Sequence, residues 1–437
     1  MGATGIIVQK IRLLVLLLLL ALLPGCSSGR FPPGQADSYH PIALQAEGFD
    51  DLEFLRPLLE GKRVVQLGEN AHGTREYNLI KARIVRFLHE ELGYDVLAFE
   101  SALYQCYDAD LTAAEVSALS TLTSCAFGVW HTEEVLPLFE YLRTTRGGDR
   151  PLRLAGIDVQ PIGNNKEGRP GFLSGAVAST DREYAAEVFT LDSLFLEVYA
   201  GGGRERREYF RSEDGQRMAE AYDRLAAFLT DHSAPNGTDP ADHRTNASGV
   251  ARQTARSMAW YIRQQAAPTT REYVERRDQG MAGNLTFLLD ELYPDRKVIV
   301  WGHNFHLRHD NLAIAPDTTM FPDVAARTMG SWVRERYGDA VYTIGLYAYQ
   351  GQAVDNSGEV YTIEPAEPGS LEALLHGVGG EALFVDLSQA PERVETAWMD
   401  EPITARYNGT TALSMILRDQ YDGILFLDHV TPRVMLY

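Results

Sequence analysis

Short, solidly apolar runs alternate along most of the chain with longer segments in which apolar residues recur every three or four positions. Such short runs are typical of strands covered on both faces, and the longer segments are typical of amphipathic helices. Their alternation indicates βαβ units, and therefore predicts an α/β fold with a mainly parallel central sheet flanked by helices. The predicted strands cover residues 63–68, 95–100, 152–157, 297–301, 341–347, 382–387 and 423–427.

A long stretch between the third and fourth predicted strands has helical patterns and no convincing strand. The helical segments are 180–199, 203–232, 249–277 and 279–292, interrupted at Ala200–Gly203 and at 233–247. An insertion of this size commonly forms a cap or lobe over the ligand-bearing edge of a sheet. We therefore expect a large helical insertion lobe over about residues 175–295.

The segment 75–92 has the pattern of a helix with one buried face. Its apolar residues are four positions apart, at Ile80, Ile84, Leu88 and Leu92. Its polar residues include Lys81, Arg83, Arg86 and Glu90. This spacing predicts that the apolar stripe packs on the sheet while the charged side chains stay accessible.

The first 25 residues have the pattern of a signal peptide. Lys10 and Arg12 precede the apolar run Leu13–Leu23, which is shorter than an ordinary membrane-spanning helix. The run ends in Leu23-Pro24-Gly25-Cys26, which resembles the lipobox of bacterial lipoproteins. We expect cleavage before Cys26, lipidation of its thiol, a tether over 26–48 and a catalytic domain over 49–437. An ordinary secretory signal is the alternative, and both place the protein outside the cytoplasm, in the cell envelope.

The composition adds two constraints on partners and class. Hydrophobic residues make up 45% and charged residues 23% of the chain, as in globular proteins. The formal net charge is −20, and −22 without residues 1–25, which contain Lys10 and Arg12 and no acid. Such a surface repels phosphate backbones, so we exclude nucleic acid as a partner. A membrane contact is expected only through the N-terminal lipid.

Two cysteines remain if Cys26 carries a lipid. Cys106 and Cys125 lie nineteen positions apart, after the second predicted strand. In an oxidising compartment an isolated pair at this separation predicts a disulfide. The alternative is two buried free thiols.

Polar side chains follow four of the predicted strands at the point where each strand ends. These are Glu69 and His72, then Glu100 and Ser101, then Asp158 and Gln160, and finally His303, Asn304 and His306. The carboxyl ends of parallel strands meet at one edge of a sheet, where α/β proteins bind their ligands. The sequence therefore predicts that these residues converge on one site.

The same segments resemble the erythromycin esterase family, which includes relatives associated with succinoglycan biosynthesis. The resemblance is carried by GENAHGTREY at 68–77, FES at 99–101, AGIDVQ at 155–160, RRDQGMAGN at 276–284, VIVWGHNFH at 298–306 and RDQYDGILFLD at 418–428. These motifs span nearly all of the chain after the signal segment. The resemblance implies a hydrolase that cleaves an ester or a macrolide lactone, although an envelope polysaccharide or another lactone is an equally good substrate candidate.

The resemblance also implies roles for individual residues. His72 matches the general base that activates water, and Glu69 and Glu100 match acids that orient the imidazole and stabilise its cation. His303 and His306 match a second histidine motif that stabilises the oxyanion or the leaving alcohol. A basic residue of the first helix belongs to this site, either Lys81 or Arg83. Asp158, Gln160 and Asn304 are candidate substrate-binding residues.

Two other interpretations use the same residues. Glu69, His72, Glu100, His303 and His306 are ligand types for a divalent metal, so a metal-dependent hydrolase or peptidase is the first alternative. A non-catalytic envelope protein that binds glycans or metal is the second. The absence of a G-x-S-x-G elbow argues against a serine α/β-hydrolase, and attack by activated water requires no cofactor.

Trp130 is expected to be a packing residue before a helix over 132–143 that Thr132 caps.

Overall fold

The computed structural model describes residues 38–161, 166–232, 246–316, 325–388 and 398–437. The predicted signal peptide, the lipidation site Cys26 and most of the predicted tether lie outside the described residues. Within the described part of the chain, no helix has the length and apolar character needed to cross a bilayer.

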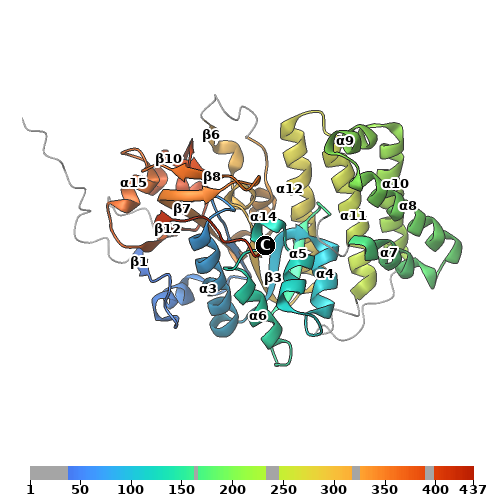
Figure 1. The fold of residues 1–437 in the computed structure, drawn as a ribbon, viewed down its shortest axis with the longest axis horizontal. Coiled ribbons are helices and arrows are strands. Elements are labelled where there is room, and N and C mark those ends of the chain that lie inside the picture. The colour runs from blue at the N-terminus through green and yellow to red at the C-terminus, as the bar shows by residue number, and fades with distance from the viewer. Residues whose placement is uncertain (1–37, 162–165, 233–245, 317–324, 389–397) are drawn as a thin grey trace, which may run out of the picture.

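A nine-stranded sheet forms the centre of the molecule (Figure 1). Its order is β1-β9-β12-β7-β2-β5-β3-β4, with β8 paired to β7. All pairings among β12, β7, β2, β5, β3 and β4 are parallel, whereas β9, β8 and β1 join by antiparallel pairs. The strands are β1 (Tyr39–Ile42), β2 (Val64–Leu67), β3 (Tyr94–Ala102), β4 (Arg153–Asp158), β5 (Lys297–Trp301), β7 (Val341–Val354), β8 (Val360–Ile363), β9 (Ala382–Asp386) and β12 (Gly423–Val430). Every predicted strand is present, and the predicted α/β fold is confirmed.

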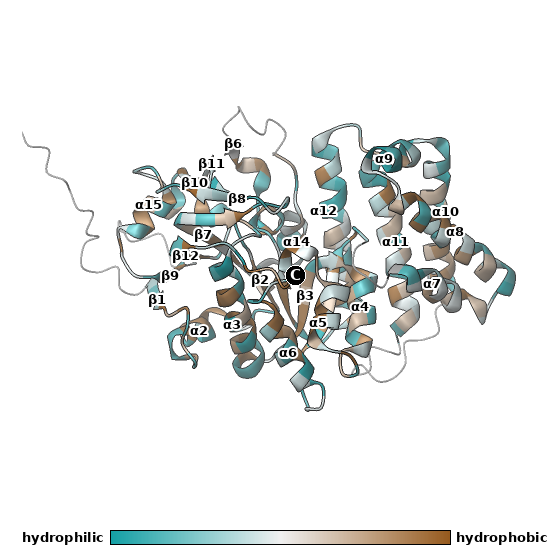
Figure 2. Cartoon of the chain, in the orientation of Figure 1, coloured by the Kyte–Doolittle hydropathy of each residue, from teal (hydrophilic) through white to brown (hydrophobic). Residues whose placement is uncertain are grey.

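Helices cover both faces of this sheet because its strands alternate their side chains between two apolar clusters. Leu97 and Phe99 of β3 belong to one cluster, whereas Val96 and Ala98 belong to the other. Figure 2 shows the central strands as a hydrophobic interior between helices with hydrophilic outer faces. The first cluster includes residues of α3 (Arg75–Leu92), α5 (Ala118–Cys125) and α6 (Leu136–Thr145), and the second includes residues of α4 (Leu103–Thr112), α12 (Thr270–Phe287) and α14 (Met329–Tyr337).

Helix α3 has the predicted bounds, and it ends at Gly93, whose φ of 73° permits a left-handed cap. Helix α6 begins at Leu136, later than the predicted 132–143. The side chain of Thr132 accepts from the backbone N–H of Val135 at 3.2 Å, so it caps a turn before the helix and not the helix itself.

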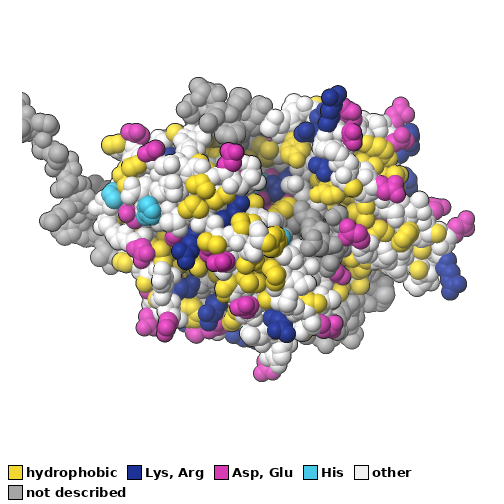
Figure 3. All heavy atoms as spheres, viewed as in Figure 1, with side chains coloured by type: hydrophobic (Ala, Val, Ile, Leu, Met, Phe, Trp, Pro, Cys, Tyr) yellow, Lys and Arg dark blue, Asp and Glu magenta, His cyan; other side chains and the backbone are white. Residues whose placement is uncertain are grey.

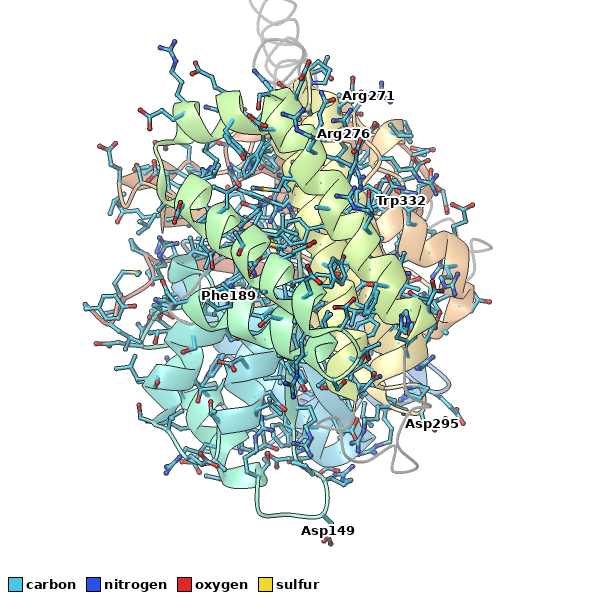
Figure 4. The ribbon with its side chains drawn as sticks, turned by 90° about the vertical axis from the view of Figure 1, so that its right-hand side faces the viewer. Asp149, Phe189, Arg271, Arg276, Asp295 and Trp332 are labelled. Carbon is cyan, nitrogen blue, oxygen red and sulfur yellow. A yellow bond between two sulfur atoms is a disulfide. The ribbon has the colours of Figure 1, made fainter. Side chains whose placement is uncertain are left out.

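The predicted helical lobe stands at one side of the molecule (Figures 1 and 4), and its helix α12 contacts the edge strand β4. Its helices are α7 (Arg169–Ala178), α8 (Arg182–Ala200), α9 (Gly203–Arg211), α10 (Glu213–Asp231), α11 (Ala247–Gln265) and α12, continued by a π-turn over Leu288–Leu292. The predicted helix 249–277 is wrong, because α11 ends before Pro268 and the Thr269 side chain caps the start of α12. Helix α12 thus runs without a break across the predicted gap after residue 277 and returns to contact β4.

Several elements near the C-terminus were not predicted. Strand β7 is twice as long as expected and folds back on β8, and β6 (Ala315–Pro316), β10 (Ile403–Tyr407) and β11 (Thr411–Met415) form a second, antiparallel sheet. The remaining short helices are α2 (Leu55–Leu58), α13 (Asn304–Leu307) and α15 (Leu371–His376). The predicted disulfide joins Cys106 to Cys125, with Cα atoms 4.2 Å apart.

Candidate active site

A cavity of about 1180 Å³ opens at the carboxyl ends of β2, β3 and β5, adjacent strands of the sheet. Strand-end residues form one part of it, which we call the floor: His72, Glu100, Gln160, His303 and His306, with Arg277 of α12 among them. The opposite part, which we call the rim, comes from later in the chain: the turn 354–361, Tyr407 with Asn408, and residues 432–435. The cavity therefore joins predicted strand ends to segments without a predicted role.

His72 and Glu69 form a hydrogen-bonded pair on the floor. The His72 Nδ1 lies 2.5 Å from Glu69 Oε1, and among the described residues Nε2 has no hydrogen-bond partner. Since Nδ1 must carry the proton that Glu69 accepts, Nε2 keeps its lone pair. The His72 side chain is 19% exposed and lines the cavity, so this nitrogen is available to a ligand.

Glu69 is completely buried, and each of its oxygens has a donor. Oε1 accepts from the indole N–H of Trp130 at 3.1 Å as well as from His72, and Oε2 accepts from the Lys81 ammonium at 2.7 Å. Burial alone would raise the pKa of Glu69, but the charges of Lys81 and His72 outweigh it and lower this pKa to about 2. Glu69 is therefore a fixed carboxylate beneath His72.

Of the two basic residues named for the site, the structure brings Lys81 to Glu69, and the prediction that its side chain stays accessible is wrong. Its ammonium is fully buried, pairs with Glu69 and lies 4.2 Å from the ring centroid of Trp301. Burial lowers the pKa of Lys81 to about 8, although Glu69 opposes this shift. The pairing with a buried carboxylate explains why a charged residue is tolerated on the sheet side of α3.

Arg83 does not belong to the site, contrary to the prediction that named it beside Lys81. Its guanidinium pairs with both oxygens of Asp51 and donates to the carbonyls of Ala43 and Gly48. Two positions further along α3, the side chain points to the N-terminal segment that packs there and away from the cavity.

Arg277 holds the second group of floor residues together. Its guanidinium donates to Glu100 Oε1 at 2.9 Å, to Asp158 Oδ2 at 2.5 Å and to His306 Nε2 at 2.9 Å. Gln160 lies beside it, with its amide oxygen facing the guanidinium in the orientation that gives both groups a partner. Asp158 does not line the cavity, so it acts on the site through Arg277 and through the backbone N–H groups of Val159 and Gln160.

Glu100 is a carboxylate and His306 is a titratable imidazole, and several neighbours keep both in place. Burial would raise the pKa of Glu100, but His306 and Arg277 outweigh it and hold this pKa well below its usual range. His306 donates from Nδ1 to Asp278 at 2.8 Å, and its Nε2 lies 3.3 Å from Glu100. Burial disfavours its charge, but Asp278 and Glu100 prevail and raise the pKa of His306. It is thus the floor histidine best suited to carry a proton.

His303 is a neutral structural contact between the two groups. Its Nδ1 accepts from the backbone N–H of Phe305 at 3.1 Å, and its Nε2 donates to the Asn70 carbonyl at 3.0 Å. Burial and the neighbouring His72 lower the pKa of His303 to about 3. Because both ring nitrogens are used, His303 contributes a fixed wall 5.0 Å from the His72 ring and is not a proton donor at neutral pH.

Asn304 lies behind the site, and the prediction that it binds substrate is not supported by its position. Its amide donates to the Leu346 carbonyl at 2.9 Å and accepts from the Leu346 N–H at 3.2 Å. A Cβ at Gly68 would lie 2.0 Å from the Asn304 amide oxygen, which explains the glycine at the end of β2. The side chain joins two strands and leaves no group for a ligand.

The predicted metal ligands have other partners. Among the described residues, no group of three or more His, Cys, Asp or Glu side chains is arranged to hold a metal ion. Both oxygens of Glu69 and both nitrogens of His303 are engaged within the protein. A metal at these residues would require the floor to rearrange.

Three residues that contact the predicted site had no predicted catalytic role. Arg277 and Asp278 lie in the RRDQGMAGN segment, so the motif marked their position without revealing their contacts. Trp130 was predicted to be a packing residue, yet it donates to Glu69 and packs edge-on against the His72 ring at 5.4 Å. Its position just before α6 gives no sign of this in the sequence.

Comparisons with known proteins identify the family of the chain. A family model described as erythromycin esterase matches residues 89–430. YbfO of Bacillus subtilis (strain 168), named as a suspected hydrolase, is 34% identical over 91% of this chain and 90% of its own length. Erythromycin esterase type II of Escherichia coli is 21% identical over 93% of this chain and 100% of its own length.

A solved structure of a Bacillus cereus protein shares the fold. It covers 92% of this chain and 97% of its own, with a TM-score of 0.76 at 21% identity. The family model and the relative at 34% identity both extend over most of the sequence and confirm the resemblance of the motifs. The chain belongs to the erythromycin esterase family.

Proposed function

We propose that this protein is a hydrolase that cleaves a carboxylic ester or lactone by water activated at His72. The observation that carries the proposal is the Glu69–His72 pair, in which a buried carboxylate fixes Nδ1 while Nε2 of a cavity-lining ring has no partner among the described residues. This is the arrangement a general base requires, since the proton-accepting nitrogen is free and the cation it forms is stabilised.

The reaction follows from these contacts. Water gives a proton to His72 Nε2 while its oxygen forms a bond to the carbonyl carbon, and the carbonyl oxygen takes the negative charge. The tetrahedral intermediate then expels the alcohol oxygen, which receives the proton from His72. The products are an acid and an alcohol, or a hydroxy acid from a lactone. Glu69, a carboxylate throughout, stabilises the imidazolium between the two steps.

Arg277 and His306 are suited to the opposite side of the reacting carbonyl. Both line the cavity and carry or readily accept positive charge, and Glu100 and Asp158 fix the guanidinium in place. A preorganised cation beside a developing oxyanion lowers the barrier without reorganisation during the reaction. Water attacks directly in this scheme, so it requires no protein nucleophile and no cofactor.

Family membership supports an ester or lactone substrate, since relatives include an Escherichia coli erythromycin esterase. A macrolide lactone is therefore the first substrate to test, with simple esters and other lactones beside it.

The test compares the wild type with His72→Asn and His429→Asn on a panel of macrolides, lactones and aryl esters. Asparagine retains a donor toward Glu69 but lacks the base, and His429 is exposed, so its variant is the matched control. We expect His72→Asn to reduce kcat about 10²–10⁴-fold and His429→Asn to leave it unchanged. Hydrolysis is read as the gain of one water by mass spectrometry. A wild type that hydrolyses none of the panel, or an equally active His72→Asn, would contradict the proposal.

We also propose that the protein works outside the cytoplasm, anchored to the cell envelope by a lipid on Cys26. The signal-like residues 1–25 and the lipobox-like sequence before Cys26 support this. Metabolic labelling with a fatty acid should mark the wild type and fail to mark Cys26→Ala. Labelling of both, or of neither, would contradict lipidation at Cys26.

A further inference from the structure

The C-terminal segment 431–437, which we call the strap, crosses the mouth of the cavity. It forms antiparallel bridges between Thr74 and Pro432 and between Thr132 and Met435. In Figure 1 the C-terminus lies at the front of the molecule, over the middle of the fold, and Figure 3 shows hydrophobic side chains gathered in this area. The strap thus connects the loop that carries His72 to the loop that follows Trp130.

The strap fixes the backbone of Arg433 next to the catalytic loop. The Arg433 N–H donates to the carbonyl of Gly73 at 3.0 Å, and the same carbonyl accepts from Val354 at 3.1 Å. A Cβ at Gly73 would lie 1.7 Å from the Val354 carbonyl oxygen, so only glycine allows this approach. The backbone of Arg433 is therefore hydrogen-bonded to Gly73, the residue after His72, at the point where the strap meets the β7–β8 turn.

The Arg433 side chain lines the cavity and is only 8% exposed. Its Nη2 donates to the Asp355 carbonyl at 3.3 Å, and its Nε lies 3.3 Å from the Met435 sulfur. Its Nη1 is buried without a hydrogen-bond partner in the part of the chain that the structure describes. The guanidinium is thus held by two weak neutral contacts, with one edge unsatisfied.

No carboxylate among the described residues contacts Arg433. Glu69, Asp355 and Glu134 lie near enough to favour its charge, but burial outweighs them and lowers the pKa of Arg433. The Asp355 carboxylate instead accepts from the backbone of Ser357 and Glu359 within its own turn. Arginine stays protonated at any physiological pH, so the cavity wall contains a nearly buried cation without an anion.

The two arginines of the cavity differ in this respect. Arg277 pairs with Glu100 and Asp158, so carboxylates of the protein already balance its charge. Burying an unpaired charge costs free energy unless a partner of opposite charge joins it. The planar fork of arginine matches the two oxygens of a carboxylate, and one positive charge balances one carboxylate.

We propose that Arg433 is the anion-binding residue of the substrate site and that the natural substrate is an ester carrying a carboxylate. The inference rests on the proposed ester hydrolysis at His72, which lines the same cavity. The substrate carboxylate pairs with Arg433 at the rim while the scissile carbonyl lies on the floor. Arg433 acts in binding, and the hydrolytic step itself needs only the floor.

The test uses two aryl esters with acyl chains of equal length. One is p-nitrophenyl pentanoate, and the other is mono-p-nitrophenyl glutarate, which ends in a carboxylate. Wild type is compared with Arg433→Met, which keeps an unbranched stem but removes the charge, with Arg433→Lys, which keeps the charge, and with Arg204→Met as an exposed control from the lobe. Thermal unfolding checks that each variant is folded.

We expect Arg433→Met to lower kcat/KM for the glutarate ester about 10–100-fold, mainly through KM, since a charged hydrogen bond is lost. The pentanoate ester should change less than about 3-fold, and Arg433→Lys should keep part of the preference. Equal losses on both esters, or no loss on either, would overturn the inference.

Free glutarate separates this inference from the proposed reaction. It should raise the unfolding temperature of wild type and Arg204→Met but not of Arg433→Met, even if wild type hydrolyses neither ester. Stabilisation of wild type by glutarate without hydrolysis would therefore contradict the proposed function and support the anion site. No effect of glutarate on wild type, or a larger effect of inorganic phosphate, would overturn the assignment of a carboxylate.

Discussion

The floor and the rim of the cavity differ in how their charged groups are satisfied. On the floor, Glu69 has donors on both oxygens and Arg277 has acceptors on three nitrogens. On the rim, Arg433 has no carboxylate partner among the described residues, and Val434 and Met435 are 41% and 39% exposed. Charged groups held by several hydrogen bonds are rigid, which suits the placement of reacting groups, whereas a buried cation without a carboxylate partner favours the binding of an anion. Under the proposed function, the floor carries out the chemistry and the rim selects the substrate.

Replacing Arg277 should have the largest effect on stability, because its guanidinium contacts Glu100, Asp158 and His306. Arg277→Met leaves Glu100 and Asp158 buried without their cation, and we expect a loss of about 4–5 kcal/mol in the free energy of unfolding. Urea unfolding measures it. The neighbouring Arg276 pairs with Glu272 at the surface of the lobe (Figure 4), so Arg276→Met should cost less than about 1 kcal/mol. If the two variants lost similar amounts of unfolding free energy, the buried ion pairs of Arg277 would not stabilise the fold more than the surface pair of Arg276.

Removing Lys81 should have a smaller but still large effect. Lys81→Met leaves Glu69 with His72 and Trp130 as donors, so we expect a loss of about 3 kcal/mol. The double variant Glu69→Gln/Lys81→Met contains no buried charge at this position and should regain most of that stability in urea unfolding. It should not regain ester hydrolysis, since His72 then lacks its carboxylate. A double variant as active as wild type would show that the floor needs no such pair.

The sequence predicted the floor because its signals are local. A strand covered on both faces is a solid apolar run, and glycine at its end marks where the loop with Glu69 and His72 begins. Parallel strands share one carboxyl edge, so residues as far apart as His72 and His303 could be brought together before any contact was known. The family motifs then supplied roles for these positions.

Contacts that depend on tertiary packing could not be predicted in this way. Helical periodicity puts Lys81 beside the apolar stripe of α3 and Arg83 about 200° around the helix from it, but it does not show that Lys81 meets a buried carboxylate while Arg83 pairs with Asp51. Arg276 and Arg277 are adjacent in sequence, and only the packing of α12 against β4 decides which one enters the cavity. The rim was missed because the extension of β7 and the strap contain mixed polar and apolar residues, with Gly351 at a φ of 133° within the strand.

The buried His303 of the floor should make the free energy of unfolding depend on pH. The folded pKa of His303 is about 3, below its unfolded value of 6.5. Between these values the unfolded chain binds a proton that the folded chain does not, so stability falls as pH decreases from about 6.5. One such group contributes about 1.4 kcal/mol per pH unit. His309 contributes in the same direction and window.

Urea unfolding from pH 6 to pH 4.5 measures this slope. His303→Gln should be less stable than wild type at pH 7. The slope of its unfolding free energy with pH should be smaller, by the amount that corresponds to about one proton taken up on unfolding. His429→Gln, at an exposed position, should keep the wild-type slope. An unchanged slope in His303→Gln would mean that His303 is protonated in the folded protein, and the floor would then contain an unbalanced cation.

The smallest effect is expected on the rim, at Asn408. This residue has a φ of 52°, in the left-handed region that asparagine and glycine tolerate better than other residues. Its N–H donates to the Asn70 side chain at 3.2 Å, and its carbonyl accepts from Tyr361 at 3.0 Å, so the backbone holds the turn in place. Asn408→Ala should cost about 1 kcal/mol in the free energy of unfolding, and Asn408→Gly should cost close to nothing.

The same pair of variants separates the rim from the floor in kinetics. A small aryl ester reaches His72 without needing the rim, so its kcat should be unchanged in both variants. A substrate that fills the cavity should show a higher KM in Asn408→Ala, because the strained turn shifts Tyr407 and Tyr361, which line the cavity beside it. If Asn408→Ala instead lowers kcat for the small ester, the rim takes part in placing the reacting groups, and the division between chemistry and substrate choice fails at this residue.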